Sequence, residues 1–118
     1  MRKIVRYSLR QGVDCIKLSA TGGTLSQGAS VGAQQYEEGE IRTAIVEAHK
    51  GEVPVAVHAH GLDGIKAALR AGADSIEHGS FCDDEALSMM ADRGVYLCPT
   101  LYNLNVDLFR MTRRMNLR

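Results

Sequence analysis

Four side chains able to bind a metal or move a proton stand near the ends of short apolar segments. His58 and His60 end one such run, His78 ends the next, and Lys17 lies near the end of an earlier one. Alternate residues of a strand point to the same side, so His58 and His60 are predicted to share a face. Imidazoles are costly to bury without partners, which makes these strand ends the first candidates for a functional site.

Glycines divide the chain into alternating segments. Gly12, Gly51, Gly72 and Gly94 each follow a segment with helical periodicity and precede a short apolar run. This alternation is typical of successive βα units with a parallel sheet, and so predicts an α/β fold. We expect helices over 1–11, 37–50, 62–71, 84–93 (with Asp83 as N-cap) and 103–114, and strands over 13–19, 53–60, 73–78 and 95–101.

The short repeat favours one α/β architecture over another. Gly51, Gly72 and Gly94 lie 21 and 22 residues apart, which suits a (β/α)8 TIM barrel better than the alternative, an open α/β sheet. A full barrel needs about 250 residues, so four strands make about half of one. We therefore expect residues 1–118 to be a fragment of a single barrel domain, either excerpted or truncated, or else to pair with further copies.

Composition excludes several classes of partner. The 14 basic and 14 acidic residues cancel, so no electrostatic footprint for nucleic acid or an anionic membrane is present. No apolar run approaches the roughly 20 residues of a membrane span, and a cytoplasmic location is expected. The three cysteines, at 15, 82 and 98, are widely spaced, and we expect small buried thiols in a reducing compartment.

Lysine and histidine at neighbouring strand ends suggest metal chemistry. We expect Lys17, His58 and His78 to lie at equivalent depth, and strands about 5 Å apart can bring imidazoles to one metal with Zn–N bonds of about 2 Å. An ammonium group would repel a cation. A neutral lysine amine, however, can take up CO2, and the resulting carbamate is an anionic oxygen ligand able to bridge two metals.

Four segments together closely resemble the metal-dependent amidohydrolase superfamily: 16–23, 55–61, 75–79 and 94–100. Within it they are similar to the imidazolonepropionase-related branch that holds prolidase-like (Xaa-Pro) dipeptidases, Xaa-Arg/Lys carboxypeptidases and ochratoxin-hydrolysing amidases. The resemblance implies two divalent ions, expected to be zinc, with Lys17 as the carboxylated bridging lysine and His58 and His78 as ligands. It places His60 at the site edge near substrate. It also implies a His-x-His pair on strand one of the barrel and a proton-shuttling aspartate on strand eight, and neither of these two strands is expected within this sequence.

The resemblance implies a hydrolase that cleaves an amide C–N bond of a small amide or dipeptide with metal-activated hydroxide, and a homo-oligomer in the full-length form. The loop 20–35 is expected to lie over the site, with Gln35 and Tyr36 as possible substrate contacts. Three alternatives stay open: a cyclic-amide hydrolase, a non-catalytic fragment, and a module that holds phosphate with the glycine-rich segment 21–24.

Overall fold

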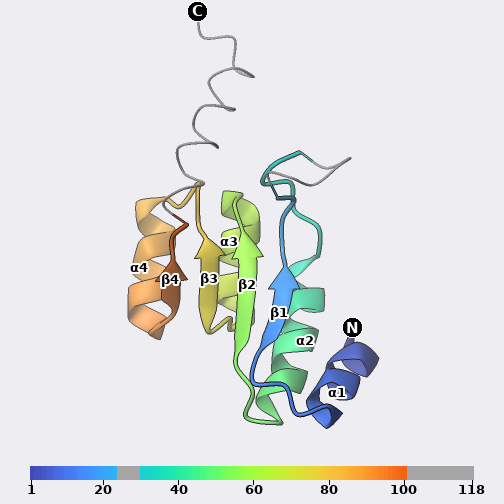
Figure 1. The fold of residues 1–118 in the computed structure, drawn as a ribbon. Coiled ribbons are helices and arrows are strands. Elements are labelled where there is room, and N and C mark those ends of the chain that lie inside the picture. The colour runs from blue at the N-terminus through green and yellow to red at the C-terminus, as the bar shows by residue number, and fades with distance from the viewer. Residues whose placement is uncertain (24–29, 101–118) are drawn as a thin grey trace, which may run out of the picture.

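A computed structural model describes residues 1–23 and 30–100, and these form four helices and four strands in strict alternation (Figure 1). Every element predicted within these ranges is present, and the helix expected over 103–114 lies outside them. The elements are α1 (Arg2–Arg10), β1 (Ile16–Ser19), α2 (Glu38–His49), β2 (Val55–Ala59), α3 (Leu62–Ala71), β3 (Ser75–His78), α4 (Asp84–Arg93) and β4 (Tyr96–Cys98).

The four strands form one parallel sheet in the order β1-β2-β3-β4, so each βα unit lies beside the one before it. All carboxyl ends therefore meet at the same edge of the sheet, the upper edge in Figure 1. The prediction of parallel strands that alternate with helices is confirmed for all four strands, and the helix of the fourth βα unit lies outside the described residues.

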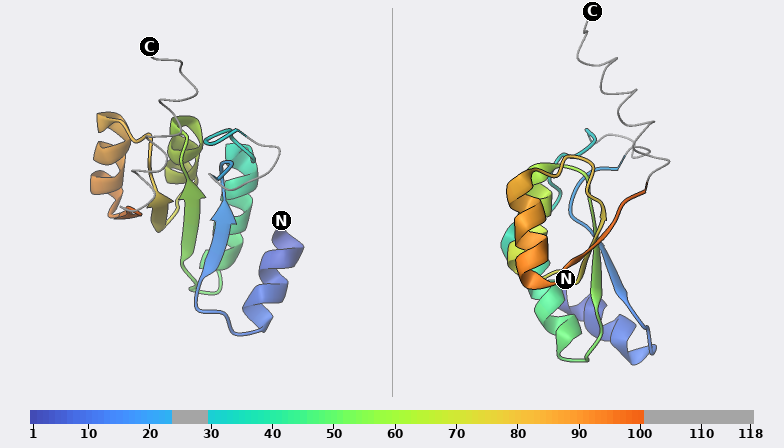
Figure 2. Two further views of the ribbon diagram at one scale, coloured as in Figure 1. Left: turned by 45° about the horizontal axis from the view of Figure 1, so that its top comes forward. Right: turned by 90° about the vertical axis from the view of Figure 1, so that its left-hand side faces the viewer.

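The helices lie against one face of the sheet and leave the other face uncovered by described residues (Figure 2). Val55, Val57 and Ala59 of β2 have no exposed surface and pack toward the helices, whereas His58 between them is half-buried. Such alternation is expected when one face of a strand is covered and the other is not. The largest fully buried apolar side chains come from α2, α3, β2 and β3: Ile41, Ile45, Ile65, Leu69, Val55, Val57 and Ile76.

Two glycines end helices as the sequence predicts. Gly72 and Gly94 follow α3 and α4 with φ of 100° and 66°, a left-handed conformation that side chains with a Cβ rarely adopt. Asp83 begins α4, and its carboxylate accepts a hydrogen bond from the Ala86 N–H at 2.8 Å. These caps turn the chain sharply from helix to strand, which keeps the units short.

The prediction of buried cysteines is wrong for two of the three. Cys15 and Cys98 are exposed, and Cys82 is partly buried against the core. Cys15 precedes β1, and Cys98 lies opposite Glu77 in the sheet register, on the uncovered face. Within residues 1–23 and 30–100, none of the helices has the length and apolar character needed to cross a membrane.

Candidate metal centre

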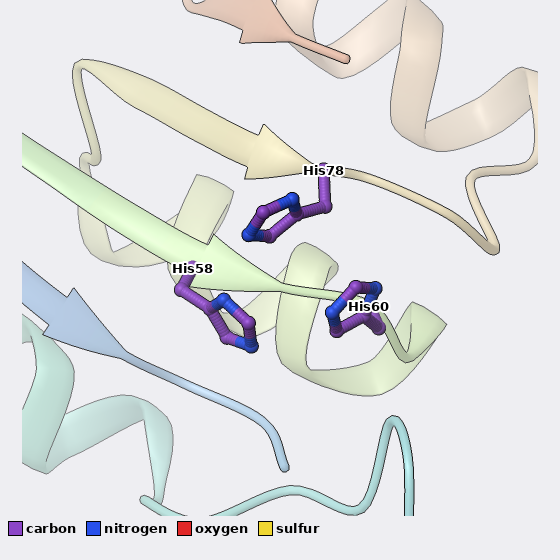
Figure 3. A group of neighbouring side chains, drawn as sticks. All are labelled: His58, His60 and His78. Carbon is purple, nitrogen blue, oxygen red and sulfur yellow. The ribbon is translucent and has the colours of Figure 1, made fainter. Parts of the chain in front are cut away.

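Three histidines meet where β2 and β3 end (Figure 3). The ring centroid of His58 lies 4.7 Å from that of His60 and 4.7 Å from that of His78, and the His60 and His78 rings stack at 4.8 Å. Each ring offers a nitrogen, and the three nitrogens lie within 4.8 Å of one another. A cluster of this size can place several imidazoles around one metal ion, since Zn–N bonds are about 2 Å long.

The register corrects the expectation that lysine and histidines lie at equivalent depth. Ile16 pairs with Val55 at the start of the ladder, so Lys17 lies opposite Ala56, two residues before His58. On the other side His78 pairs with Ala59, one residue beyond His58. The register depends on which residues pair along the two strands. Residues that end neighbouring strands therefore need not lie opposite each other. Lysine must therefore use the length of its side chain to approach the histidines.

His78 has a left-handed backbone, with φ of 73°, which is uncommon for a residue with a side chain. Ile76 has no exposed surface and packs with the core, so strict alternation would put Glu77 on the uncovered face and His78 with Ile76. Instead the His78 ring stands beside those of His58 and His60. The left-handed turn thus places two successive polar side chains on the same side, and such strain is often found at functional sites.

The His58 ring is held neutral. Its pKa is lowered from 6.5 to about 4, most of all by burial and then by the positive charges of His60, His78 and Lys17, against a smaller opposing effect of Glu77. Its Nε2 is buried and has no hydrogen-bond partner among the described residues. An unpartnered buried nitrogen costs free energy unless something binds it. A neutral imidazole is the form that binds zinc, so the residues present fit a metal ion.

His60 lies within the cluster rather than at its edge. Only 1% of its surface is exposed; its Nδ1 lies 2.7 Å from the Ser80 hydroxyl, and its backbone N–H donates to Thr21 Oγ1 at 2.9 Å. Segments that follow two other strands, β1 and β3, therefore hold this residue. The structure brings His60 as close to the other two rings as they are to each other, and its role as a substrate contact stays a prediction.

Glu77 is a site residue that the sequence analysis missed. It pairs with His58 in the register, and its Oε2 lies 3.8 Å from the Nζ of Lys17. Burial raises the pKa of Glu77, but the hydrogen bond from Ser75 and the charge of Lys17 outweigh burial and hold that pKa below its usual value. Strand alternation could have predicted this position of Glu77. A buried Ile76 directs the next side chain, Glu77, to the face that carries His58 and Lys17.

The loop after β1 is held against the start of α3 at the same edge. A Cβ on Gly61 would lie 2.0 Å from the carbonyl oxygen of Gly32, so only glycine allows this approach. Within the loop, the Gly22 N–H donates to the Ala33 carbonyl at 2.8 Å. That donor is used inside the loop, which argues against the phosphate-binding alternative for this segment.

Tyr36 and Gln35 make loop contacts. The Tyr36 carbonyl accepts a hydrogen bond from the Gln34 side chain at 2.8 Å, and the Gln35 N–H donates to the Ala20 carbonyl at 2.8 Å. Tyr36 is 38% exposed, which leaves its ring open to solvent. Substrate contact by either residue stays a prediction.

The chain is similar to several solved structures. It matches a Xaa-Pro dipeptidase with bound methionine at 42% identity and a TM-score of 0.82, over 86% of this chain and 25% of that one. It matches a prolidase complexed with N-methylphosphonate-L-proline at 36% identity and a TM-score of 0.81, over 85% of this chain and 24% of that one. These similarities favour the barrel over the open sheet, and the four βα units correspond to part of an amidohydrolase TIM barrel.

Ochratoxinase of Aspergillus niger is similar in both sequence and structure. The sequences are 34% identical over 100 residues, which is 85% of this chain and 21% of the relative. The solved structure matches with a TM-score of 0.84 and 32% identity, over 92% of this chain and 25% of that one. The chain thus spans about a quarter or less of the length of these relatives. The sequence pattern of the Amidohydrolase family matches residues 2–116, and the chain belongs to that family.

Proposed function

We propose that the protein is a metal-dependent hydrolase that cleaves an amide C–N bond in a small substrate of the dipeptide or N-acyl amino acid class. The observation that carries this proposal is the buried, unpartnered Nε2 of His58 within a cluster of three histidines at the carboxyl edge of the sheet. Active sites of TIM-barrel enzymes lie at this edge. Membership of the amidohydrolase family supports the same reaction class.

In this proposal His58 and His78 are ligands of one of two zinc ions. The low pKa of His58 keeps a lone pair on its ring at neutral pH, as a metal ligand requires. Lys17 supplies an anionic ligand after its neutral amine adds to CO2, which forms an N–C bond and releases a proton. The side chain of Lys17 is 56% exposed, so CO2 can reach its amine.

A divalent ion held there would polarise the substrate carbonyl and lower the pKa of a bound water from about 16 toward about 7. The protein's own contribution is to orient the ligands and the substrate. Ser80 contacts the ring of His60 and Thr21 accepts from its backbone N–H, and these two contacts would orient the ring toward substrate. Tyr36, with an exposed ring on the loop after β1, is the second proposed contact.

The substrate class follows from the relatives. An ochratoxinase, a Xaa-Pro dipeptidase and a prolidase are among the proteins that the chain resembles at more than 30% identity. Dipeptides and N-acyl amino acids are therefore the first substrates to test, with a cyclic imidazolone as the comparison compound.

The test uses the intact protein with zinc and a panel of these three substrate types. We expect hydrolysis of a dipeptide or an N-acyl amino acid that a chelator abolishes and added zinc restores. Lys17→Ala should lower the rate by at least about 100-fold, because a metal ligand is lost, and short carboxylic acids should restore part of it. Lys3→Ala, which removes an exposed lysine of α1, is the matched control and should keep the full rate.

Two results would count against the proposal in different ways. A Lys17→Ala protein with full metal content and full rate would contradict the carbamate ligand. A protein that hydrolyses none of the panel, or does so equally well in excess chelator, would contradict the metal-dependent hydrolase itself.

A further inference from the structure

A hydroxyl group from the next strand contacts the His78 ring on its Nδ1 side. Thr100 follows β4, and its Oγ1 lies 2.6 Å from the Nδ1 of His78, with both residues partly buried. β4 is the neighbour of β3 in the sheet, so this hydrogen bond joins the carboxyl ends of two adjacent strands. Residue 99 is proline, which restricts the backbone of Cys98 before it and fixes its own φ.

When a metal is bound, the chemistry of the two groups decides which of them donates this hydrogen bond and which accepts it. A histidine that binds a metal through Nε2 must keep its proton on Nδ1, and that proton needs an acceptor. The threonine hydroxyl accepts through its oxygen lone pairs, and in the absence of metal it can also donate to an unprotonated Nδ1. The hydroxyl can therefore stay in place when a metal binds. Because the bond that it accepts and the bond that it donates differ in strength, it also biases the ratio of the two tautomers in the metal-free protein.

We propose that Thr100 is a positioning residue for His78. Its hydroxyl holds the imidazole at Nδ1, so that Nε2 is the atom that binds metal. The inference rests on the proposed function, since it assumes that His78 is a ligand. The left-handed backbone at His78 makes the contact necessary, because a side chain that departs from strand alternation needs support beyond the sheet.

The same arrangement occurs at His60. The Ser80 hydroxyl lies 2.7 Å from the Nδ1 of His60, and the two rings stack with only 10° between their planes. Two hydroxyl groups thus contact the Nδ1 atoms of two stacked imidazoles, one from the turn after β3 and one from the segment after β4. The repeat indicates that Nδ1 is the supporting side of each ring.

The test compares Thr100→Val, Thr100→Ser and the unchanged protein, all as the intact chain. Zinc affinity is measured by competition with a chelator, and the two neutral tautomers of the His78 ring are measured by nitrogen NMR in the metal-free protein. Valine keeps the shape but removes the acceptor, so we expect Thr100→Val to bind zinc about 10- to 100-fold more weakly. Thr100→Ser should stay within about threefold of the unchanged protein, since it keeps the hydroxyl.

Thr43→Val is the matched control. Thr43 lies on α2, where its hydroxyl donates to the Gly39 carbonyl at 2.7 Å. This variant loses a threonine hydroxyl far from the cluster in sequence, and should leave zinc affinity and the His78 tautomer ratio unchanged. Thermal unfolding of each variant identifies any loss of affinity that comes from a loss of folded protein.

The outcomes separate the two proposals. Zinc affinity in Thr100→Val equal to that of the unchanged protein, with the same tautomer ratio, would overturn the role of Thr100. If the unchanged protein binds no zinc, the proposed function fails, and the tautomer ratio alone decides on Thr100: a shift in Thr100→Val but not in Thr43→Val supports the positioning role, and no shift overturns it.

Discussion

The two edges of the sheet use histidine in opposite ways. At the amino edge, His49 Nε2 lies 2.8 Å from Asp74 Oδ2, and the same oxygen accepts the Val55 N–H at 2.7 Å. Both side chains there are 43% exposed. At the carboxyl edge, His58 has a buried Nε2 without a partner among the described residues, and its ring lies against two other imidazoles.

The difference separates a histidine that stabilises the fold from one whose buried ring nitrogen has no partner among the described residues. The hydrogen bonds of His49 and Asp74 connect the end of α2 to the start of β2, so this pair stabilises the fold. The two side chains are already paired with each other, so neither needs a ligand. At the carboxyl edge, the hydroxyls of Ser80 and Thr100 contact the Nδ1 atoms of His60 and His78. Ring nitrogens of all three histidines lie within 4.8 Å of one another. Stability at one edge and chemistry at the other is the usual division in a TIM barrel.

The largest expected effect is on metal binding. His58→Asn in the intact protein should lower zinc affinity by more than about 100-fold if His58 is the ligand that we propose, because the ligand itself is then lost rather than its support. His49→Asn is the matched control at the other edge and should leave zinc affinity unchanged. Chelator competition measures both. Equal affinities in the two variants would mean that the edges do not differ in function.

The next effect concerns the close contact between the backbone of Gly32 and Gly61 at the carboxyl edge. Gly61→Ala would bring a Cβ within 2.0 Å of the Gly32 carbonyl oxygen, and the free energy of unfolding should fall by about 2 kcal/mol as the loop moves away. Gly39→Ala on α2 meets no atom within 4 Å and should raise the free energy of unfolding by about 1 kcal/mol. Urea unfolding measures both, and a stable Gly61→Ala protein would show that the loop contact is dispensable.

Strand ends and helix periodicity were enough to predict the parallel α/β fold and the meeting of His58 and His78 at one edge of the sheet. The alternation of buried Val55, Val57 and Ala59 with His58 follows directly from the sequence, and it places His58 on the uncovered face. Glycine and Asp83 signals located the helix ends because capping is a local interaction. Parallel pairing of consecutive units then brings His58 and His78 together, whatever the details of the site.

The parts that could not be predicted depend on geometry between segments. The register pairs Lys17 with Ala56, two residues before His58 on β2. Such pairing depends on both strands together and cannot be derived from either sequence alone. The left-handed backbone of His78 does not follow from its residue type, because histidine adopts this conformation more often than most side chains but still only rarely. The contact of Thr100 with His78 joins residues 22 positions apart, and only the assembled edge shows it.

A smaller effect is the pH dependence of the free energy of unfolding, which we expect His58 at the carboxyl edge to cause. The pKa of His58 in the folded protein is about 4, below the 6.5 of an unfolded chain. As pH falls from about 6.5 to about 4, the unfolded chain takes up a proton that the folded protein does not, so the metal-free protein should lose stability across this window. Replacing His58 by Gln removes the titrating ring and should flatten that part of the curve.

Urea unfolding in excess chelator at pH 7, 6, 5 and 4 measures this effect. The slope of the free energy of unfolding against pH should be smaller for His58→Gln than for the unchanged protein between pH 6.5 and 4. Identical slopes would show that the His58 ring is not held neutral by burial. Zinc in place of chelator should deepen the loss in the unchanged protein, since protons compete with metal for the imidazoles.

The smallest effect tests the amino edge alone. Asp74→Ala removes the acceptor of the Val55 N–H and the partner of His49, and should lower the free energy of unfolding by about 1 kcal/mol because the exposed groups can turn to water. Zinc affinity and hydrolysis should not change, since within residues 1–23 and 30–100 the side-chain hydrogen bonds of Asp74 go to His49 and Val55 and not to the cluster. A loss of zinc affinity in this variant would show that the two edges are coupled through β2, and the division between a stabilising edge and a reactive one would have to be abandoned.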